Sequence, residues 1–247
     1  FVLRVENFNK RLDVLDINYA NHLYEVEGDL ISENGKLSYT LRSVSKTHPI
    51  FYSIDGGTPT EKYNLPITVD TSMVIKAAVY ENGLNELGSM FSKEINFHKA
   101  VGNKIIINKE PHKAYSGSGS AGLINGISGS DTRYGDKEWL GFWGDDVEII
   151  IDLGEEKDIN NIETRFHNGQ GQWIYAPKYI EISFNEKDFE GYEIGNSEET
   201  LVRFLQDFKN VTAKIIKIKV PNYGLIPEGK QGSGNKAWTF IDEIIIN

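Results

Sequence analysis

The chain has 247 residues, a formal net charge of −10, 11% aromatic residues and no cysteine. Nucleic acids and anionic membrane surfaces are bound through basic patches, so this acidic balance argues against both as partners. The lack of cysteine excludes disulfides, thiolate nucleophiles and cysteine-ligated zinc. No stretch approaches the roughly 20 apolar residues of a membrane span. Neutral ligands or cations are the expected partners, and the length suits two domains of ordinary size.

The first 15 residues have the spacing of an amphipathic helix. Its apolar positions are Phe1, Val5, Phe8, Leu12 and Leu15. One short helix cannot form a core, so we expect this stripe to pack against a neighbour upstream. The sequence begins without a Met or a signal segment, which predicts a processed chain or a fragment.

From residue 36 the period of the apolar pattern changes to two. Leu37, Tyr39 and Leu41 alternate with polar residues, which predicts a strand. We expect further strands over 50–54, 67–69, 74–80 and 91–97, and a polar loop over 27–35. The sharpest turn is Asp-Gly-Gly-Thr-Pro-Thr at 55–60, where glycine permits positive φ. These elements predict a small β-sandwich that ends near residues 98–103.

A second series of strands follows. They are expected over 105–107, 147–153, 159–166, 179–184, 215–220 and 241–246. Long polar connections separate them, above all residues 115–144, which contain eight glycines. Loops of this length on a rigid sandwich commonly carry binding residues.

Two pairs of neighbouring carboxylates could suggest glycoside hydrolysis: Asp145 with Asp146, and Asp242 with Glu243. Side chains of adjacent strand residues point to opposite faces, so Asp242 and Glu243 should not converge on one sugar bond. We interpret them as solvated or as metal ligands. No catalytic residue is predicted, and we expect the chain to be inactive by itself.

The second strand series resembles the discoidin or coagulation-factor type C domain, and within that group the family 32 carbohydrate-binding modules. Five blocks in order carry the resemblance. They are Leu-Ile-Asn-Gly-Ile at 123–127, Trp-Leu-Gly-Phe at 139–142, the apolar run at 147–154, Trp-Ile at 173–174 with Pro-Lys-Tyr-Ile-Glu-Ile-Ser at 177–183, and Trp-Thr-Phe-Ile-Asp-Glu-Ile at 238–244.

Residues 48–98, with the turn at 55–60, resemble the small chitobiase C-terminal domain. Residues 1–26, with Arg-Leu-Asp at 11–13 and Ile-Asn-Tyr at 17–19, resemble the end of a family 20 β-N-acetylhexosaminidase barrel. The combined resemblance implies an all-β chain: a short N-terminal helix, an immunoglobulin/fibronectin-like sandwich and a discoidin-type jelly-roll β-sandwich. The implied boundaries are 1–28 for the barrel remnant, 29–102 for the chitobiase-like domain and 103–247 for the carbohydrate-binding domain. We expect 103–247 to fold alone.

The implied function is that of a non-catalytic, carbohydrate-binding region of a secreted bacterial glycoside hydrolase. The parent enzyme would be a β-N-acetylhexosaminidase that acts on terminal N-acetylhexosamine. The expected partners are glycans with terminal galactose or N-acetylhexosamine, bound by a monomer in a secreted, periplasmic or cell-surface location. The alternative is a protein-adhesion or structural spacer module without sugar binding, and a spacer would bury or lack the loop aromatics.

The resemblance also suggests a sugar site. In family 32 modules the loop equivalent to residues 167–172 carries polar sugar contacts, and imidazole and amide groups suit neutral hydroxyls. Aromatic rings suit the apolar face of a sugar. The candidates are His167, Asn168 and Gln170 as polar contacts, Arg133 as a donor, and Tyr134, Trp143 and Trp238 as platforms. We expect His167 and Asn168 to be exposed, and Trp139 and Trp173 to lie in the core.

Domains of this type commonly hold a structural Ca²⁺, which takes six to eight oxygen ligands. The ligands implied by the resemblance are the carbonyls of Gly122, Ile127 and Asp242, the side chain of Asn125, both oxygens of Ser130, and the Glu243 carboxylate. Asn125 stands where the family usually has Asp, and the lost charge is expected to weaken the site.

Overall fold

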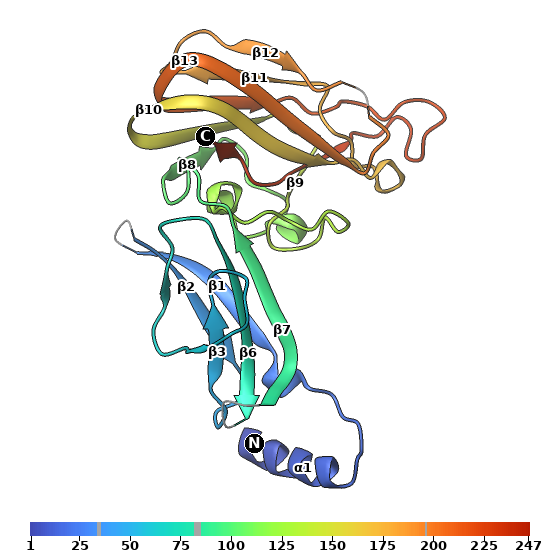
Figure 1. Cartoon of the computed structure of the whole chain (residues 1–247). Coiled ribbons are helices and arrows are strands. Elements are labelled where there is room, and N and C mark those ends of the chain that lie inside the picture. The colour runs from blue at the N-terminus through green and yellow to red at the C-terminus, as the bar shows by residue number, and fades with distance from the viewer. Residues whose placement is uncertain (34–35, 82–84, 196) are drawn as a thin grey trace. The chain divides into compact units, whose positions relative to one another are not determined.

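The computed structural model describes residues 1–33, 36–81, 85–195 and 197–247. The ladders between its strands are antiparallel, which confirms the all-β class. The chain divides into two compact units, Phe1–Phe97 and His98–Asn247 (Figure 1). The division at residues 28 and 102 stays a prediction. None of the described helices is both long and apolar enough to cross a membrane.

The first unit contains two small sheets. One has the order β1-β2-β5 and the other the order β4-β3-β6-β7. Their strands are β1 (Val26–Glu33), β2 (Lys36–Ser43), β3 (Ile50–Ser53), β4 (Glu61–Lys62), β5 (Ile67–Thr68), β6 (Met73–Glu81) and β7 (Asn85–Ile95). Alternate residues of β2 and β6 point inward, so Tyr39, Leu41 and Ile75 are buried.

The expected polar loop over 27–35 is wrong for residues 27–33, because these residues form most of β1; residues 34–35 lie outside the described residues. Strand β1 pairs with β2 along its whole length. Gly28 lies against the ring of Tyr39, and a Cβ at this position would come within 2.3 Å of the ring. A glycine that weakens the local strand pattern is therefore required by packing.

Helix α1 (Val2–Val14) forms where the periodicity predicts it, and a short 3-10 helix η1 (His22–Tyr24) follows. The side chains that α1 buries are polar, namely those of Glu6 and Asn9. Glu6 accepts hydrogen bonds from Ser45 Oγ (2.7 Å) and Thr47 Oγ1 (2.9 Å). Several residues of the apolar stripe, including Phe1 and Phe8, remain exposed.

The second unit is built on an eight-stranded sheet of order β12-β11-β13-β10-β14-β9, with β8 and β15 also paired to β10. Its strands are β8 (Lys104–Ile107), β9 (Leu140–Trp143), β10 (Val147–His167), β11 (Tyr179–Phe184), β12 (Glu190–Glu193), β13 (Leu201–Val220), β14 (Trp238–Ile241) and β15 (Ile245–Ile246). Within the described residues of this unit, the loops contain the 3-10 helices η2 (Lys113–Tyr115), η3 (Ser120–Ile124) and η4 (Gln170–Gln172).

Strands β10 and β13 are long and pair with each other, with register shifts near residues 152–161 of β10. The last part of β13 pairs with β11, and its first part carries Phe204 and Phe208 against rings of β12 and β11. Phe208 meets Phe184 of β11 edge-on at 5.0 Å, and Phe204 meets Tyr192 of β12 at 6.5 Å. Residues of both long strands, from one end to the other, therefore lie in one hydrophobic core.

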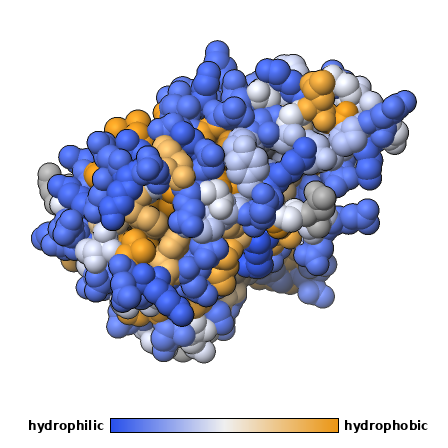
Figure 2. Space-filling model, turned by 90° about the horizontal axis from the view of Figure 1, so that it is seen from above, coloured by the Kyte–Doolittle hydropathy of each residue, from blue (hydrophilic) through white to orange (hydrophobic). Residues whose placement is uncertain are grey.

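The sequence pattern underestimates the length and the number of the strands in the second unit. The segments expected at 147–153 and 159–166 are one strand, the segment at 215–220 is only the end of β13, and β9 and β12 are not expected at all. The segment expected at 241–246 is interrupted, so Asp242 and Glu243 lie between β14 and β15. Figure 2 shows hydrophilic side chains over most of the visible face, in keeping with the high charge.

Candidate functional site

Two tryptophans stack at the edge of the second unit. Trp143 ends β9 and lies directly opposite Trp238, which begins β14. Their ring centroids are 5.8 Å apart and the planes differ by 17°. Trp143 is 52% exposed, and its Nε1 donates to the carbonyl of Lys236 at 3.3 Å. The strand pairing thus holds an indole ring in a defined orientation while half of its surface faces solvent.

Two residues that sequence reasoning did not select extend this aromatic surface. His112 meets Trp238 edge-on at 5.1 Å, and Tyr115 meets the same ring at 5.4 Å. His112 also caps η2 by accepting a hydrogen bond from the backbone N–H of Ala114. The sequence signal that could have identified these two residues is their position at the start of the glycine-rich stretch at 115–144. Nothing local indicates that they reach Trp238, more than 120 residues away.

Tyr134 connects the stacked tryptophans to the loop at 167–172. Its ring lies 5.9 Å from Tyr115, 5.1 Å from Phe240 and 5.0 Å from His167. Tyr134 is half-buried, and its neighbour Arg133 is exposed. The structure therefore brings four predicted residues, Tyr134, His167, Trp143 and Trp238, into one aromatic cluster through Tyr115 and Phe240.

The expected exposure of His167 is wrong. His167 is the last residue of β10 and is only 3% exposed, because its ring lies between those of Tyr134 and Trp139. Neither ring nitrogen has a hydrogen-bond partner within the described residues. Burial lowers the pKa of His167, because the charged imidazolium loses its hydration.

The expected exposure of Asn168 is also wrong, since this residue is 6% exposed. Its Nδ2 donates to the carbonyls of Ser197 (2.8 Å) and Glu199 (3.1 Å), and its Oδ1 accepts from the N–H of Ala176 at 3.3 Å. Asn168 therefore ties three backbone segments together, and its amide is occupied by the protein. Gln170, in η4, is half-exposed.

The other two tryptophans, Trp139 and Trp173, differ in how deeply they are buried. Trp139 is fully buried, as expected, and its Nε1 donates to the carbonyl of Ser130 at 3.0 Å. Trp173 is half-buried rather than in the core, has a left-handed backbone with φ 66°, and packs beside Tyr175 and Ile226.

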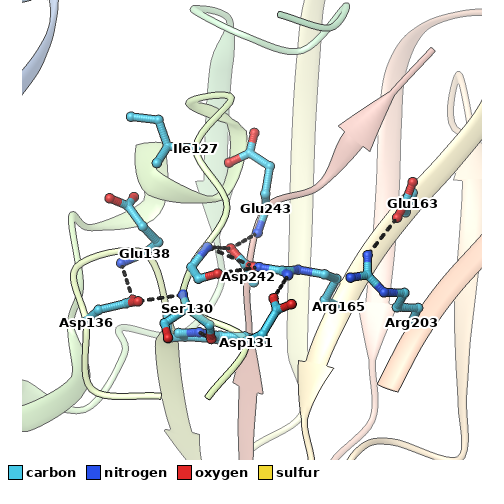
Figure 3. Close-up of polar contacts among 12 residues, drawn as sticks. Ile127, Ser130, Asp131, Asp136, Glu138, Glu163, Arg165, Arg203, Asp242 and Glu243 are labelled. Atoms are coloured by element: carbon cyan, nitrogen blue, oxygen red, sulfur yellow. Dashed lines mark hydrogen bonds and ion pairs between the residues drawn. The ribbon is translucent and has the colours of Figure 1, made fainter. Parts of the chain in front are cut away.

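The residues predicted as calcium ligands lie in one region, where the 122–130 loop meets residues 242–243 (Figure 3). Asn125 Oδ1 accepts from the N–H of Ile127 at 2.8 Å, and Asn125 Nδ2 donates to Glu138 at 3.1 Å. The N–H of Ser130 donates to Asp136 at 2.6 Å. The loop is held by its own polar groups, which make an Asx turn at Asn125.

Glu243 is 1% exposed and accepts three N–H donors. These are His98 Nε2 (2.7 Å), the backbone N–H of Gly126 (2.7 Å) and that of Asn125 (3.3 Å). Burial raises the pKa of Glu243, against the effect of the backbone donors. Burial also lowers the pKa of His98 to about 4. The solvated interpretation of Glu243 is wrong.

Asp242 is also fully buried, and its carboxylate points to a different partner. It accepts bonds from Arg165 Nε (2.8 Å) and Nη2, and from the N–H of Gly129 (3.1 Å). Arg165 Nη1 also pairs with Asp131 at 2.6 Å (Figure 3). Asp242 and Glu243 have separate partners, but they lie between β14 and β15, so the opposite-face argument, which assumed that both lie within a strand, does not apply to them.

The chain was compared with known proteins. Residues 32–92 match the family described as chitobiase/beta-hexosaminidase C-terminal domain. No curated protein matches the chain. Among solved structures, similar ones include a fucose-binding module of Streptococcus pneumoniae, at 13% identity and a TM-score of 0.39, which covers 61% of this chain and 94% of that one.

Chitosan-binding module 1 of a Paenibacillus sp. IK-5 chitosanase/glucanase is 11% identical with a TM-score of 0.38, covering 62% of this chain and 99% of that one. A GH29 fucosidase of Ruminococcus gnavus is 17% identical with a TM-score of 0.37, covering 61% of this chain. This chain spans only 26% of the fucosidase. The sequence match at 32–92 confirms the resemblance deduced from the turn at 55–60: this segment of the first unit matches the chitobiase/beta-hexosaminidase C-terminal domain family.

Proposed function

We propose that the second unit, His98–Asn247, binds carbohydrate through the aromatic surface of Trp143 and Trp238, as an accessory region of a glycoside hydrolase. The observation that carries the proposal is the 52% exposure of Trp143 while it is held on Trp238. Two stacked indole rings, one of them half-exposed, offer a ligand a flat apolar platform in a fixed orientation. A ring of this kind packs well against the apolar C–H face of a sugar.

The surroundings of this ring suit a neutral ligand. Asp145, two residues after Trp143, forms an ion pair with Lys109 at 3.9 Å, so these two charges offset each other. The Nδ1 of the exposed His112 ring accepts from the N–H of Ala114, so its Nε2–H is left to donate a hydrogen bond to a ligand. A spacer module would bury its loop aromatics, and the exposure of Trp143 argues against that alternative.

The parent activity is part of the same proposal. The family matched at residues 32–92 is named for chitobiase and β-hexosaminidase, which supports a β-N-acetylhexosaminidase parent and a glycan with terminal N-acetylhexosamine or galactose. Such glycans occur mainly outside the cytoplasm, so a secreted, periplasmic or cell-surface location is proposed with it. The chain itself is proposed to bind and not to hydrolyse.

The test is retention of the full chain on immobilised glycans, with Trp143→Ala as the variant. Trp143 is exposed, so we expect retention to fall at least tenfold while the melting temperature changes by only about 2–4 °C. Leu205→Ala is the matched control, because Leu205 is an exposed apolar residue on β13 of the same unit. Equal retention of wild type and Trp143→Ala would exclude the surface of Trp143 and Trp238 as the sugar-binding site. If wild type is not retained by any glycan of a broad array, the spacer alternative is favoured.

A further inference from the structure

The contacts of His98 determine which of its ring nitrogens carries the proton. Its Nδ1 accepts hydrogen bonds from the backbone N–H groups of Ala100 and Ile246, each at 3.3 Å. A nitrogen that accepts two donors carries no proton, so the proton of the neutral ring is on Nε2. His98 Nε2 therefore donates to Glu243 Oε1, at 2.7 Å.

Two backbone donors complete the surroundings of Glu243. The N–H of Gly126 donates to the same oxygen as His98, and the N–H of Asn125 donates to Oε2. All three donors direct positive hydrogens at the carboxylate lone pairs that a calcium ion would use. A cation and these N–H groups compete for the same oxygens.

Other members of the predicted calcium set are engaged in the same way. Asn125 Oδ1 accepts from the N–H of Ile127, the Ser130 carbonyl accepts from Trp139 Nε1, and Ser130 Oγ accepts from the N–H of Thr132 at 3.3 Å. Glu243 is also the only carboxylate in that set, because Asp242 was expected to contribute its carbonyl and its carboxylate pairs with Arg165. Calcium affinity rises with the number of charged ligands, so this set does not fit Ca²⁺.

We propose that residues 98, 125–126 and 243 form a metal-independent clasp, in which His98 Nε2–H and two backbone N–H groups take the place of a structural cation. The clasp joins the first residue of the second unit to the 122–130 loop and, through Nδ1, to the last strand, β15. It holds these three segments together whether or not calcium is present. The proposal does not depend on sugar binding.

The first test is a calcium titration of the EDTA-treated full chain. All four tryptophans, at 139, 143, 173 and 238, lie in the second unit, so intrinsic fluorescence reports the melting of that unit. We expect the same melting temperature, within about 1 °C, in EDTA and in millimolar CaCl₂, and no saturable heat in calorimetry. A rise in melting temperature with Ca²⁺ that Glu243→Gln removes would overturn the proposal.

The second test compares two substitutions of His98. Asn preserves an acceptor near the position of Nδ1 and lacks the Nε2 donor, whereas Gln places an N–H donor near the position of Nε2. We expect His98→Asn to lower the melting temperature by roughly 5 °C, because a buried carboxylate loses a donor, and His98→Gln to lower it less. A His98→Asn variant that melts at the wild-type temperature would contradict the clasp. If neither variant folds, the calcium titration of wild type still decides between clasp and metal site.

Discussion

The buried pair of Arg165 and Asp242 gives the sharpest stability prediction. Asp242 is 0% exposed and receives two N–H groups from Arg165 (Figure 3). Arg165→Met keeps much of the aliphatic volume and removes the charge, leaving the carboxylate with the backbone N–H groups of Gly129 and Glu243 alone. Removing one partner of a buried pair costs about 3–5 kcal/mol, so we expect a loss of that size.

The reverse substitution should cost less. After Asp242→Asn, Arg165 retains Asp131 at 2.6 Å and the carbonyl of Gly129 at 2.8 Å, so its charge stays paired. We expect a cost of about 1–3 kcal/mol for this variant. The double variant should be more stable than the sum of the single losses predicts, with a coupling energy of at least about 1 kcal/mol.

Urea unfolding followed by tryptophan fluorescence measures these free energies for the second unit. The matched control is Arg203→Met, because Arg203 forms an ion pair with Glu163 at 3.7 Å across the same two strands, β10 and β13, while its side chain is 57% exposed. An exposed pair contributes little after solvent screening, so we expect a change below about 1 kcal/mol. Equal losses for Arg165→Met and Arg203→Met, or a coupling energy near zero, would refute the reasoning.

Two further predictions concern the 167–172 loop. Asn168→Ala leaves the carbonyls of Ser197 and Glu199 without their donor, so we expect the second unit to lose about 2 kcal/mol in urea unfolding; a change within about 0.5 kcal/mol would mean that the amide is not structural. The lowered pKa of His167 means that the unfolded chain binds more protons as the pH falls below about 6.5, so the contribution of His167 to stability decreases with decreasing pH below that value and is constant above it; buried His98 adds a slope of the same sign. His167→Leu should reduce this slope between pH 6.5 and 5, measured as melting temperature against pH, and an unchanged slope would show that the imidazole protonates freely in the folded protein.

The local pattern of apolar and polar residues was enough to predict many of the strands. Alternation of apolar and polar residues predicted β2, β6, both ends of β10 and the C-terminal end of β13, because the side chains of a strand face opposite sides at every second residue. The turn at 55–60 identified the chitobiase-like segment, and the comparison at 32–92 confirms it. The core position of Trp139 was also predicted, whereas the strand expected through Asp242 and Glu243 is interrupted at these two residues.

Tertiary structure alone decided which polar residues are buried. The stretch from His167 to Gln172 looks like a solvated loop because all its residues are polar or glycine, yet backbone from 197–200 covers Asn168 and aromatic rings cover His167. The partner of Glu243, His98, is 145 residues away in the sequence, and no local spacing could place the two side chains 2.7 Å apart. A buried carboxylate is stable only with donors around it, and the fold supplies them by bringing distant segments together, which no periodicity along the chain encodes.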